Sequence, residues 1–463
     1  MTIRSVSDEV LLKIFRYYLD AFPRFWPRLV HVCRKWRQIV FASQRALHLR
    51  LFCTHRTPVL KTLDCWPALP IVLHYGGAPA LDPPTPNDED NIMAAMKHPD
   101  RVSSISLTVT SSLLEKLSAT ERLFSELEEL VLLSQGSVRL TLPNAFRWGV
   151  CLRTLHLTGA AIPALPELLS PSKGLIDLQI HKIPDVGYFS PEAFVNALSG
   201  MTQLRTLSLH FLSFPPHLHT LGSPPRSWER VVLPALACLE YRGISEYMDR
   251  LVARIDAPRL GGIDITFFGQ SKMDTSQLCR FINRIEMQKS HSRAEILSSE
   301  RAISISFTHP ESPTRLKLQM SCKTLARQLS YMAKICSRLS AFILGVEHLH
   351  ISSTQSPSGQ DYNDRVEWLN LISPFRGTKW FHVAGDHSKN IVLALHSWQR
   401  DAVQPVLPAL HKLCVREPEP RCAHLQESVV SFIRSCRLLG HMVGAEYERV
   451  RINELRGTGT TFV

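Results

Sequence analysis

The sequence is poor in cysteine, and its cysteines form no recognisable ligand pattern. Eleven cysteines are spread over 463 residues, their number is odd, and no two are spaced as C-x-x-C. This distribution excludes a disulfide-rich scaffold and gives no sign of a zinc ribbon or a thiol redox motif. We therefore expect a reduced intracellular protein, cytoplasmic, nuclear or both.

Long apolar runs are also missing. Charged side chains interrupt the first ten positions, so no signal-peptide pattern is present there. The longest uncharged apolar stretch, 65–81, contains Pro67, Pro70 and the pair Gly76-Gly77. A membrane-spanning helix needs about 20 continuous apolar residues. We expect no membrane partner.

Catalytic and cofactor motifs are absent as well. The sequence contains no G-x-S-x-G, Walker A, G-x-G-x-x-G or H-E-x-x-H motif, so we expect no enzyme and no cofactor. The best metal candidate is the set His411, Cys414, Cys422 and His424, whose side chains are of the types that bind zinc. Because His411 and Cys414 overlap a strand-like pattern, we favour an incidental grouping and expect no metal.

The first 56 residues have the pattern of a small helical unit. Ser7 is a candidate N-cap, and Asp8 and Glu9 place negative charge on the first turn of a helix. Two apolar stripes at helical spacing and a third short segment predict three helices, near 7–19, 29–40 and 43–51. The stripes consist of Val10, Leu11, Ile14, Phe15, Tyr18 and Leu19, and of Leu29, Val32, Cys33, Trp36, Ile39 and Val40.

Two motifs in this segment resemble an F-box. The first is Ser7-Asp-Glu-Val-Leu-Leu-x-Ile-Phe15, and the second is Cys33-Arg-Lys-Trp36, which matches the Cys-x-x-Trp of that motif. The opening departs from the motif, because Val6-Ser7 stands where Leu-Pro is usual. The following residues, through 63–70, are similar to the large F-box family of mushroom-forming (basidiomycete) fungi.

The resemblance implies a substrate-receptor subunit of a Skp–cullin–F-box ubiquitin ligase. Its partners would be a Skp-type adaptor, through it a cullin–RING ligase, and an unidentified protein target. The residues implied in adaptor binding or in the core of the F-box, two roles that the sequence does not separate, are Val10, Leu11, Leu12, Phe15, Leu29, Val32, Cys33 and Trp36.

The rest of the chain carries a recurring apolar-x-x-apolar-x-apolar pattern. The copies beginning at 102, 127, 152, 175 and 204 are 23 to 29 residues apart, the period of leucine-rich repeats. Further copies begin at 236, 260, 346, 378 and 410, whereas the region between Ile265 and Val346 looks like a hairpin around His309-Pro310. The asparagine or cysteine typical of regular repeats is missing. We therefore predict an α/β protein: a three-helix F-box (1–56), a transition with a first irregular repeat (57–100), and a degenerate leucine-rich-repeat solenoid (101–463), with a curved parallel sheet and helices outside it.

Positive charge is concentrated in the helical segment. The chain has a net charge of +12; residues 1–56 hold eleven Lys and Arg against three Asp and Glu, so +8 lies there and +4 in the remainder. A basic helical surface suits nucleic acid or an acidic protein. Skp-type adaptors are acidic, and we favour the adaptor over nucleic acid. A second alternative is a repeat scaffold whose helices only cap the sheet and recruit no ligase.

Overall fold

The computed structural model describes most of the chain. The described residues are 6–76, 84–118, 122–134, 140–141, 146–148, 150–162, 164–213, 230–269, 273–285, 291–309, 312–322, 324–353, 364–385, 387–401, 405–418, 423–438 and 440–450. They fall into two compact units. Unit 1 comprises Met1–Ser190 and Gly200–Leu204, and unit 2 comprises Pro191–Ser199 and Arg205–Val463.

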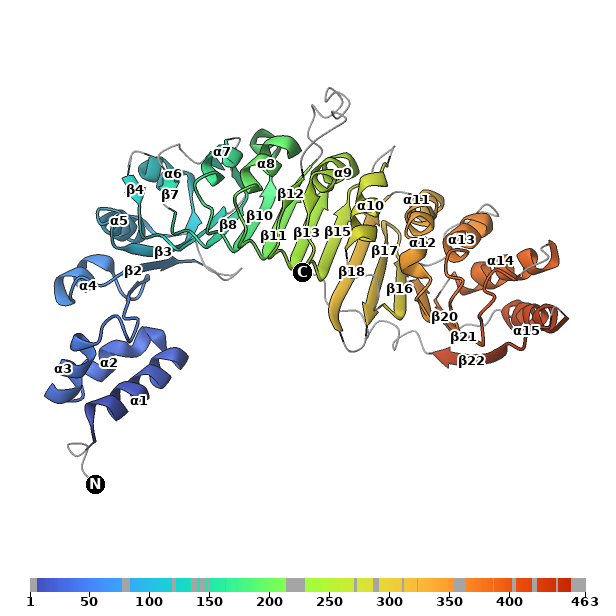
Figure 1. Ribbon diagram of the computed structural model, residues 1–463, viewed down its shortest axis with the longest axis horizontal. Helices are drawn as coiled ribbons and strands as arrows, with labels where there is room; N and C mark the ends of the chain where they lie inside the picture. Colours follow the sequence, from blue (N-terminus) through green and yellow to red (C-terminus); the bar gives the residue numbers. More distant parts are fainter. Residues whose placement is uncertain are drawn as a thin grey trace. The chain divides into compact units, whose positions relative to one another are not determined.

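Unit 1 begins with helices and continues with a parallel sheet (Figure 1). Its helices are α1 (Asp8–Ala21), η2 (Pro23–Phe25), α2 (Trp26–Val30), α3 (Arg34–Ala42), α4 (Val59–Cys65), α5 (Pro86–Ala95), α6 (Ser111–Ser118), α7 (Leu165–Leu169) and η3 (Asp185–Gly187). The sheet strands, in spatial order, are β1 (Leu51–Cys53), β2 (Ile71–Tyr75), β3 (Val102–Val109), β5 (Glu129–Ser134), β8 (Thr154–Thr158) and β10 (Asp177–Ile183), all parallel. Two small parallel pairs join β4 (Arg122–Phe124) to β7 (Phe146–Trp148), and β6 (Leu140–Thr141) to β9 (Ala160–Ala161).

Unit 2 contains a mostly parallel sheet. Its helices are α8 (Pro191–Leu198), α9 (Ser245–Ala253), α10 (Ser276–Arg284), α11 (Leu325–Arg338), α12 (Ser340–Ile343), α13 (Asp364–Ile372), α14 (Ser388–Asp401) and α15 (Ala423–Leu438). The strands, in spatial order, are β11 (Thr206–Phe211), β13 (Cys238–Gly243), β15 (Gly262–Phe267), β18 (Ser312–Ser321), β17 (Ala302–His309), β16 (Arg293–Ser298), β19 (His348–Ser353), β20 (Trp380–Ala384), β21 (Lys412–Pro418) and β22 (Gly444–Val450). Among the described strands of this unit, only the β18–β17 and β17–β16 pairings are antiparallel, and a separate parallel pair joins β12 (Val231–Val232) to β14 (Ile255–Asp256).

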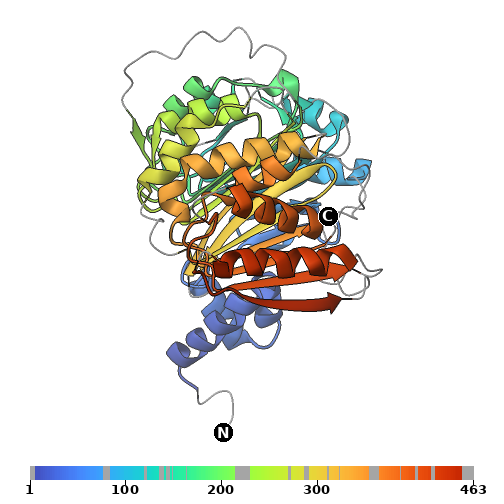
Figure 2. The same ribbon diagram turned by 90° about the vertical axis from the view of Figure 1, so that its right-hand side faces the viewer.

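The core of each unit lies between its sheet and the helices that cover one face of that sheet (Figure 1). In unit 1, Ile105, Leu130, Leu155 and Leu178 occupy paired positions on adjacent strands and are fully buried. Burial of one such side chain contributes about 2 kcal/mol. In unit 2, α11, α13, α14 and α15 pack side by side in one layer (Figure 2).

The α/β class is therefore confirmed, and so are the strands expected from the apolar pattern. Each copy of that pattern lies on a strand of unit 1 or of unit 2, and its second and third apolar residues are buried. The expected hairpin is the antiparallel pair β17–β18. Strands β1, β2, β16 and β22 were not foreseen, because they are short or lack the leucine spacing.

The helix boundaries of the first segment were partly wrong. The second predicted helix, 29–40, is broken in two, since His31 and Val32 form a turn and Cys33 is the N-cap of α3. The third predicted helix, 43–51, is a succession of turns that leads into β1. Leu47 and Leu49 are buried nonetheless, because the turns fold them back onto the helices.

Candidate functional site

Helix α1 separates its apolar residues onto two faces. It begins at Ser7, whose Oγ accepts the backbone N–H of Val10 at 3.4 Å, as expected for an N-cap. Leu11, Phe15 and Leu19 lie at helical spacing and are buried in one hydrophobic cluster with Trp26, Leu29 and Val40. The opposite face is open to solvent. The helix thus contributes one stripe to the core and leaves a second one exposed.

The exposed stripe consists of Val10, Ile14 and Tyr17. Their exposed fractions are 47%, 50% and 80%, and their i, i+4, i+7 spacing places them along one side of the helix. Phe22, Phe25 and Val32 are exposed nearby in the sequence. Within the described part of the chain, no other stretch of similar length exposes as many large apolar side chains. Contiguous exposed apolar groups typically mark interaction surfaces.

The eight residues that the sequence implicated divide into three groups. Leu11, Phe15 and Leu29 are at most 6% exposed and belong to the core. Leu12 and Trp36 are partly buried and pack against that core, Trp36 edge to face with Phe15 at 4.7 Å between ring centroids. Val10, Val32 and Cys33 are exposed. Only this last group offers a free apolar surface.

Ile14 and Tyr17 were missing from the site predicted from the sequence. Ile14 was counted in the first apolar stripe and Tyr17 was passed over, although their spacing from Val10 was readable. Periodicity identifies apolar faces, but it does not tell which of two neighbouring faces the rest of the fold covers.

The cations of this segment are mostly exposed. Two of them form ion pairs: Lys35 with Asp8 at 3.0 Å, and Arg50 with Glu128 at 3.1 Å. Arg28 lies over the ring of Phe25, 4.1 Å from its centroid. Among the described residues, no ion pair is formed by the exposed Lys13, Arg16, Arg24, Arg34, Arg37, Arg45 and Arg56. The exposed apolar stripe therefore belongs to a strongly basic segment.

The helical segment is attached to the start of the sheet through tryptophans. The indole Nε1 of Trp26 donates a hydrogen bond of 2.7 Å to the carbonyl of Arg50, just before β1. Trp26 also packs edge to face against Trp66, with ring centroids 4.8 Å apart. Leu51 of β1 and Leu69 belong to the same buried cluster as the helices. The segment therefore shares its core with the first strands of unit 1.

The thiols with shifted pKa values are inert. Burial raises the pKa of Cys53, Cys279 and Cys436 to about 11, so these groups are protonated at neutral pH. The thiolate is the nucleophilic form, and a nucleophilic cysteine needs a pKa near or below neutrality. These side chains pack the core.

The zinc candidate is only partly within the described residues. His411 is exposed and its Nδ1 lies 2.7 Å from the carbonyl oxygen of Ala409, whereas Cys414 is buried in β21. Cys422 and the side chain of His424 lie outside the described residues. Two other histidines, His348 and His350, lie on strand β19: His348 stacks on Trp380 with ring centroids 4.3 Å apart, and His350 Nδ1 lies 3.5 Å from Glu295.

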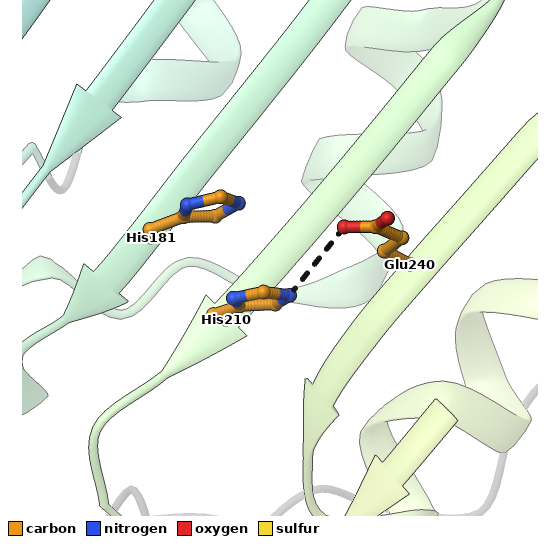
Figure 3. A group of neighbouring side chains, drawn as sticks. All are labelled: His181, His210 and Glu240. Atoms are coloured by element: carbon orange, nitrogen blue, oxygen red, sulfur yellow. Dashed lines mark ion pairs between the residues drawn. The ribbon is translucent and has the colours of Figure 1, made fainter. Parts of the chain in front are cut away.

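The sheet face of unit 2 that is not covered by helices is lined by polar side chains; we call it the open face. Figure 3 shows His210 of β11 and Glu240 of β13, whose Nε2 and Oε2 atoms are 4.0 Å apart. Glu240 also accepts the hydroxyl of Ser208 at 3.1 Å. Further along the sheet, Lys317 Nζ lies 3.3 Å from Asp264. This face offers ion pairs and hydrogen-bonding groups to solvent or to a partner.

Comparison with models of known protein families gave no match, and no curated protein is significantly similar to the chain. Within the described residues, no helix is long and apolar enough to cross a membrane.

Proposed function

We propose that the chain is the substrate receptor of a Skp–cullin–F-box ubiquitin ligase. Helices α1–α3 would be the F-box that binds a Skp-type adaptor. The strand-and-helix array would be an irregular leucine-rich-repeat domain that binds the protein target. The chain would act inside the cell and would itself perform no chemistry. The observation that carries the proposal is the exposed stripe Val10, Ile14 and Tyr17 on a helix whose other face is buried.

The charge around this stripe supports an acidic protein as its partner. Exposed cations surround it in the sequence, and most of those in the described part form no ion pair. An acidic partner complements this surface in charge while its apolar groups cover the stripe, which favours fast and specific association. Skp-type adaptors have this combination of acidic charge and apolar contact surface.

The leucine-rich-repeat assignment is supported by the cadence of the strands. In unit 1, β5, β8 and β10 begin at Glu129, Thr154 and Asp177, a spacing within the range of leucine-rich repeats. Each of the three strands has at least two buried leucine or isoleucine residues. Stacked repeats of this kind provide extended surfaces for protein partners.

A second candidate is a scaffold in which α1–α3 only cap the sheet. It is favoured by the shared core, because Trp26 and Trp66 tie the helices to the first strands. In that case the helices would shield the end of the array, and no adaptor would be recruited. The exposed apolar stripe is the feature that this alternative leaves unexplained.

The test of the proposed function is affinity purification of the full chain from its own cells with the proteasome inhibited. We expect a Skp-type adaptor and a cullin to co-purify, together with proteins that accumulate under inhibition. Recovery of neither adaptor nor cullin would favour the scaffold.

A further inference from the structure

Four side chains of the types that surround metal ions lie side by side on the open face of unit 2. Glu295 of β16 is paired with His350 of β19, His350 with His382 of β20, and His382 with Cys414 of β21. All three pairings are parallel and in register, so the residues form one row across strands that are about 4.8 Å apart. The residues next to them along these strands are buried against the helices, so the row lies on the face without helices.

The two imidazoles of the row are close to the arrangement of two ligands on one zinc ion. The ring centroids of His350 and His382 are 6.2 Å apart, and their planes are 89° from each other. Two imidazoles that bind one tetrahedral zinc ion, each with a Zn–N distance of about 2.1 Å, have centroids about 5 Å apart. The rings therefore need to approach each other by about 1 Å. Both side chains are only half-buried, so rotation about their own torsions permits this movement.

Glu295 makes the contact that a metal-binding histidine usually makes through its second nitrogen. Its Oε1 lies 3.5 Å from Nδ1 of His350. The hydrogen bond with His350 lowers the pKa of Glu295, so the carboxylate is charged at neutral pH and accepts the proton of Nδ1. With that proton on Nδ1, Nε2 keeps the lone pair that binds a metal ion, and the carboxylate fixes the orientation of the ring.

Cys414 adds a sulfur ligand to the row. Its side chain is 2% exposed and alternates with Leu413 and Val415, which are buried against the helices. Two imidazoles and a thiolate favour zinc over calcium or magnesium, because those ions prefer oxygen ligands. The negative charges of the thiolate and of Glu295 together balance the double positive charge of a zinc ion.

We propose that His350, His382 and Cys414 bind a zinc ion and that Glu295 positions His350 for this role. Zinc replaces the proton of the Cys414 thiol, which passes to solvent, and a water molecule completes the tetrahedron. The ion ties β19, β20 and β21 together on the open face. The inference does not depend on the proposed function, because it requires neither an adaptor nor a target. Its ligands share only Cys414 with the zinc candidate considered from the sequence.

The experiment titrates the purified, metal-free full chain with Co²⁺ and then with Zn²⁺. Co²⁺ takes the place of zinc in tetrahedral sites, and with a thiolate ligand it has a charge-transfer band and strong visible bands. We expect these bands to saturate at about one equivalent of Co²⁺. They should disappear when Zn²⁺ is added, because zinc binds such a site more tightly.

Variants of the row separate the ligands from the positioning residue. His350→Ala and His382→Ala should each weaken zinc binding at least about a hundredfold, and Cys414→Ser should abolish the charge-transfer band. Glu295→Gln should weaken binding about tenfold and leave the saturated cobalt spectrum unchanged, because Glu295 is not itself a ligand. Since both histidines are half-buried, their variants test the site even where the buried Cys414 is needed for folding.

His411→Ala is the matched control, because His411 is an exposed histidine of the zinc candidate considered from the sequence. Cys65→Ser is the control for exposed thiols. Both variants should bind zinc as the wild type does. Absence of saturable binding at micromolar zinc, or unchanged affinity in His350→Ala and His382→Ala, overturns the proposal. So does a charge-transfer band that persists in Cys414→Ser or that disappears in His411→Ala or Cys65→Ser.

Discussion

Val10 and Leu11 are consecutive in α1, yet Val10 is 47% exposed and Leu11 is 3% exposed. This relationship separates a surface role from a core role within the same motif. Loss of binding in a variant of Leu11 or Phe15 would therefore report unfolding, whereas a variant of Val10 or Ile14 reports on the surface.

The first prediction follows from this division. Phe15→Ala should destabilise the helical segment by about 3–5 kcal/mol, because it leaves a cavity where a fully buried ring stood. Val10→Ser should change stability by less than about 0.5 kcal/mol. Hydrogen exchange of backbone amides in 8–42 measures both. Equal protection of these amides from exchange in Phe15→Ala and Val10→Ser would contradict the assignment of Phe15 to the core and Val10 to the surface.

The second prediction compares two tryptophans. Trp26 donates its indole N–H to the carbonyl of Arg50, whereas the buried Nε1 of Trp36 has no hydrogen-bond partner among the described residues. Trp26→Phe should cost about 1–2 kcal/mol more than Trp36→Phe, since only Trp26→Phe leaves a carbonyl unpaired. Chemical unfolding followed by tryptophan fluorescence provides the comparison. A larger loss for Trp36→Phe would show that the hydrogen bond to Arg50 is not important.

The third prediction concerns Glu89 of α5, whose carboxylate is nearly buried. It accepts hydrogen bonds from Lys116 at 2.8 Å, Ser112 at 3.0 Å and Thr110 at 3.1 Å, and these link α5 to the start of α6. Burial alone would raise the pKa of Glu89, but the three donors together hold it below its ordinary value. Glu89→Ala should cost about 2 kcal/mol at pH 7.

The sign of its pH dependence is fixed by that lowered pKa. The carboxylate stabilises the fold above about pH 4.5, and this stabilisation is lost as the pH falls through the folded-state pKa. In Glu89→Gln this part of the acid loss should be absent. Urea unfolding of the wild type and Glu89→Gln between pH 3 and 7 measures this loss. An equal loss of unfolding free energy in both proteins as the pH falls would contradict the prediction.

The fourth prediction concerns Asp249, which behaves in the opposite way. Its carboxylate accepts the backbone N–H groups of Gln277 at 3.1 Å and Leu278 at 2.8 Å, and so caps α10 from α9. Burial raises its pKa to about 6 despite these two hydrogen bonds. The folded state therefore binds the proton more tightly than the unfolded chain, and stability falls as the pH rises from about 4 to 6.

Asp249→Asn keeps an acceptor oxygen without the buried charge. This variant should not lose stability as the pH rises from about 4 to 6. At pH 7 it should be as stable as the wild type, or more stable by up to about 3 kcal/mol. Asp249→Ala, which removes the acceptor, should be less stable than Asp249→Asn at every pH. Unfolding curves of the wild type and both variants at pH 4 and 7 measure these differences. If the stability of the wild type relative to Asp249→Asn were greater at pH 7 than at pH 4, the raised pKa of Asp249 would be disproved.

The sequence was most informative where burial and periodicity coincide. Leu130, Leu155 and Leu178 could be placed on strands because parallel strands under a helical layer need large apolar residues at alternate positions. Helix α8 begins at Pro191, directly after Ser190, an order of residues that is typical of helix starts.

Local capping was less predictable, since several hydroxyls compete for one helix end. Two hydroxyls lie near the start of α6: Thr110 accepts the N–H of Leu113 at 3.1 Å, whereas Ser112 donates to Glu89. The α5 helix starts with a capping box between Thr85 and Asp88. These choices depend on tertiary partners that the local sequence does not reveal.

The proposed function requires that the exposed stripe of α1 bind a Skp-type adaptor. The most direct measurement is titration calorimetry of the purified adaptor against the full chain and two variants. We predict binding by the wild type, at least about a hundredfold weaker binding by Val10→Asp/Ile14→Asp, and no change in Val366→Asp, a helix position in α13 that is more exposed than either. Absence of binding by the wild type, or equal affinity in the Val10→Asp/Ile14→Asp chain, would contradict the claim.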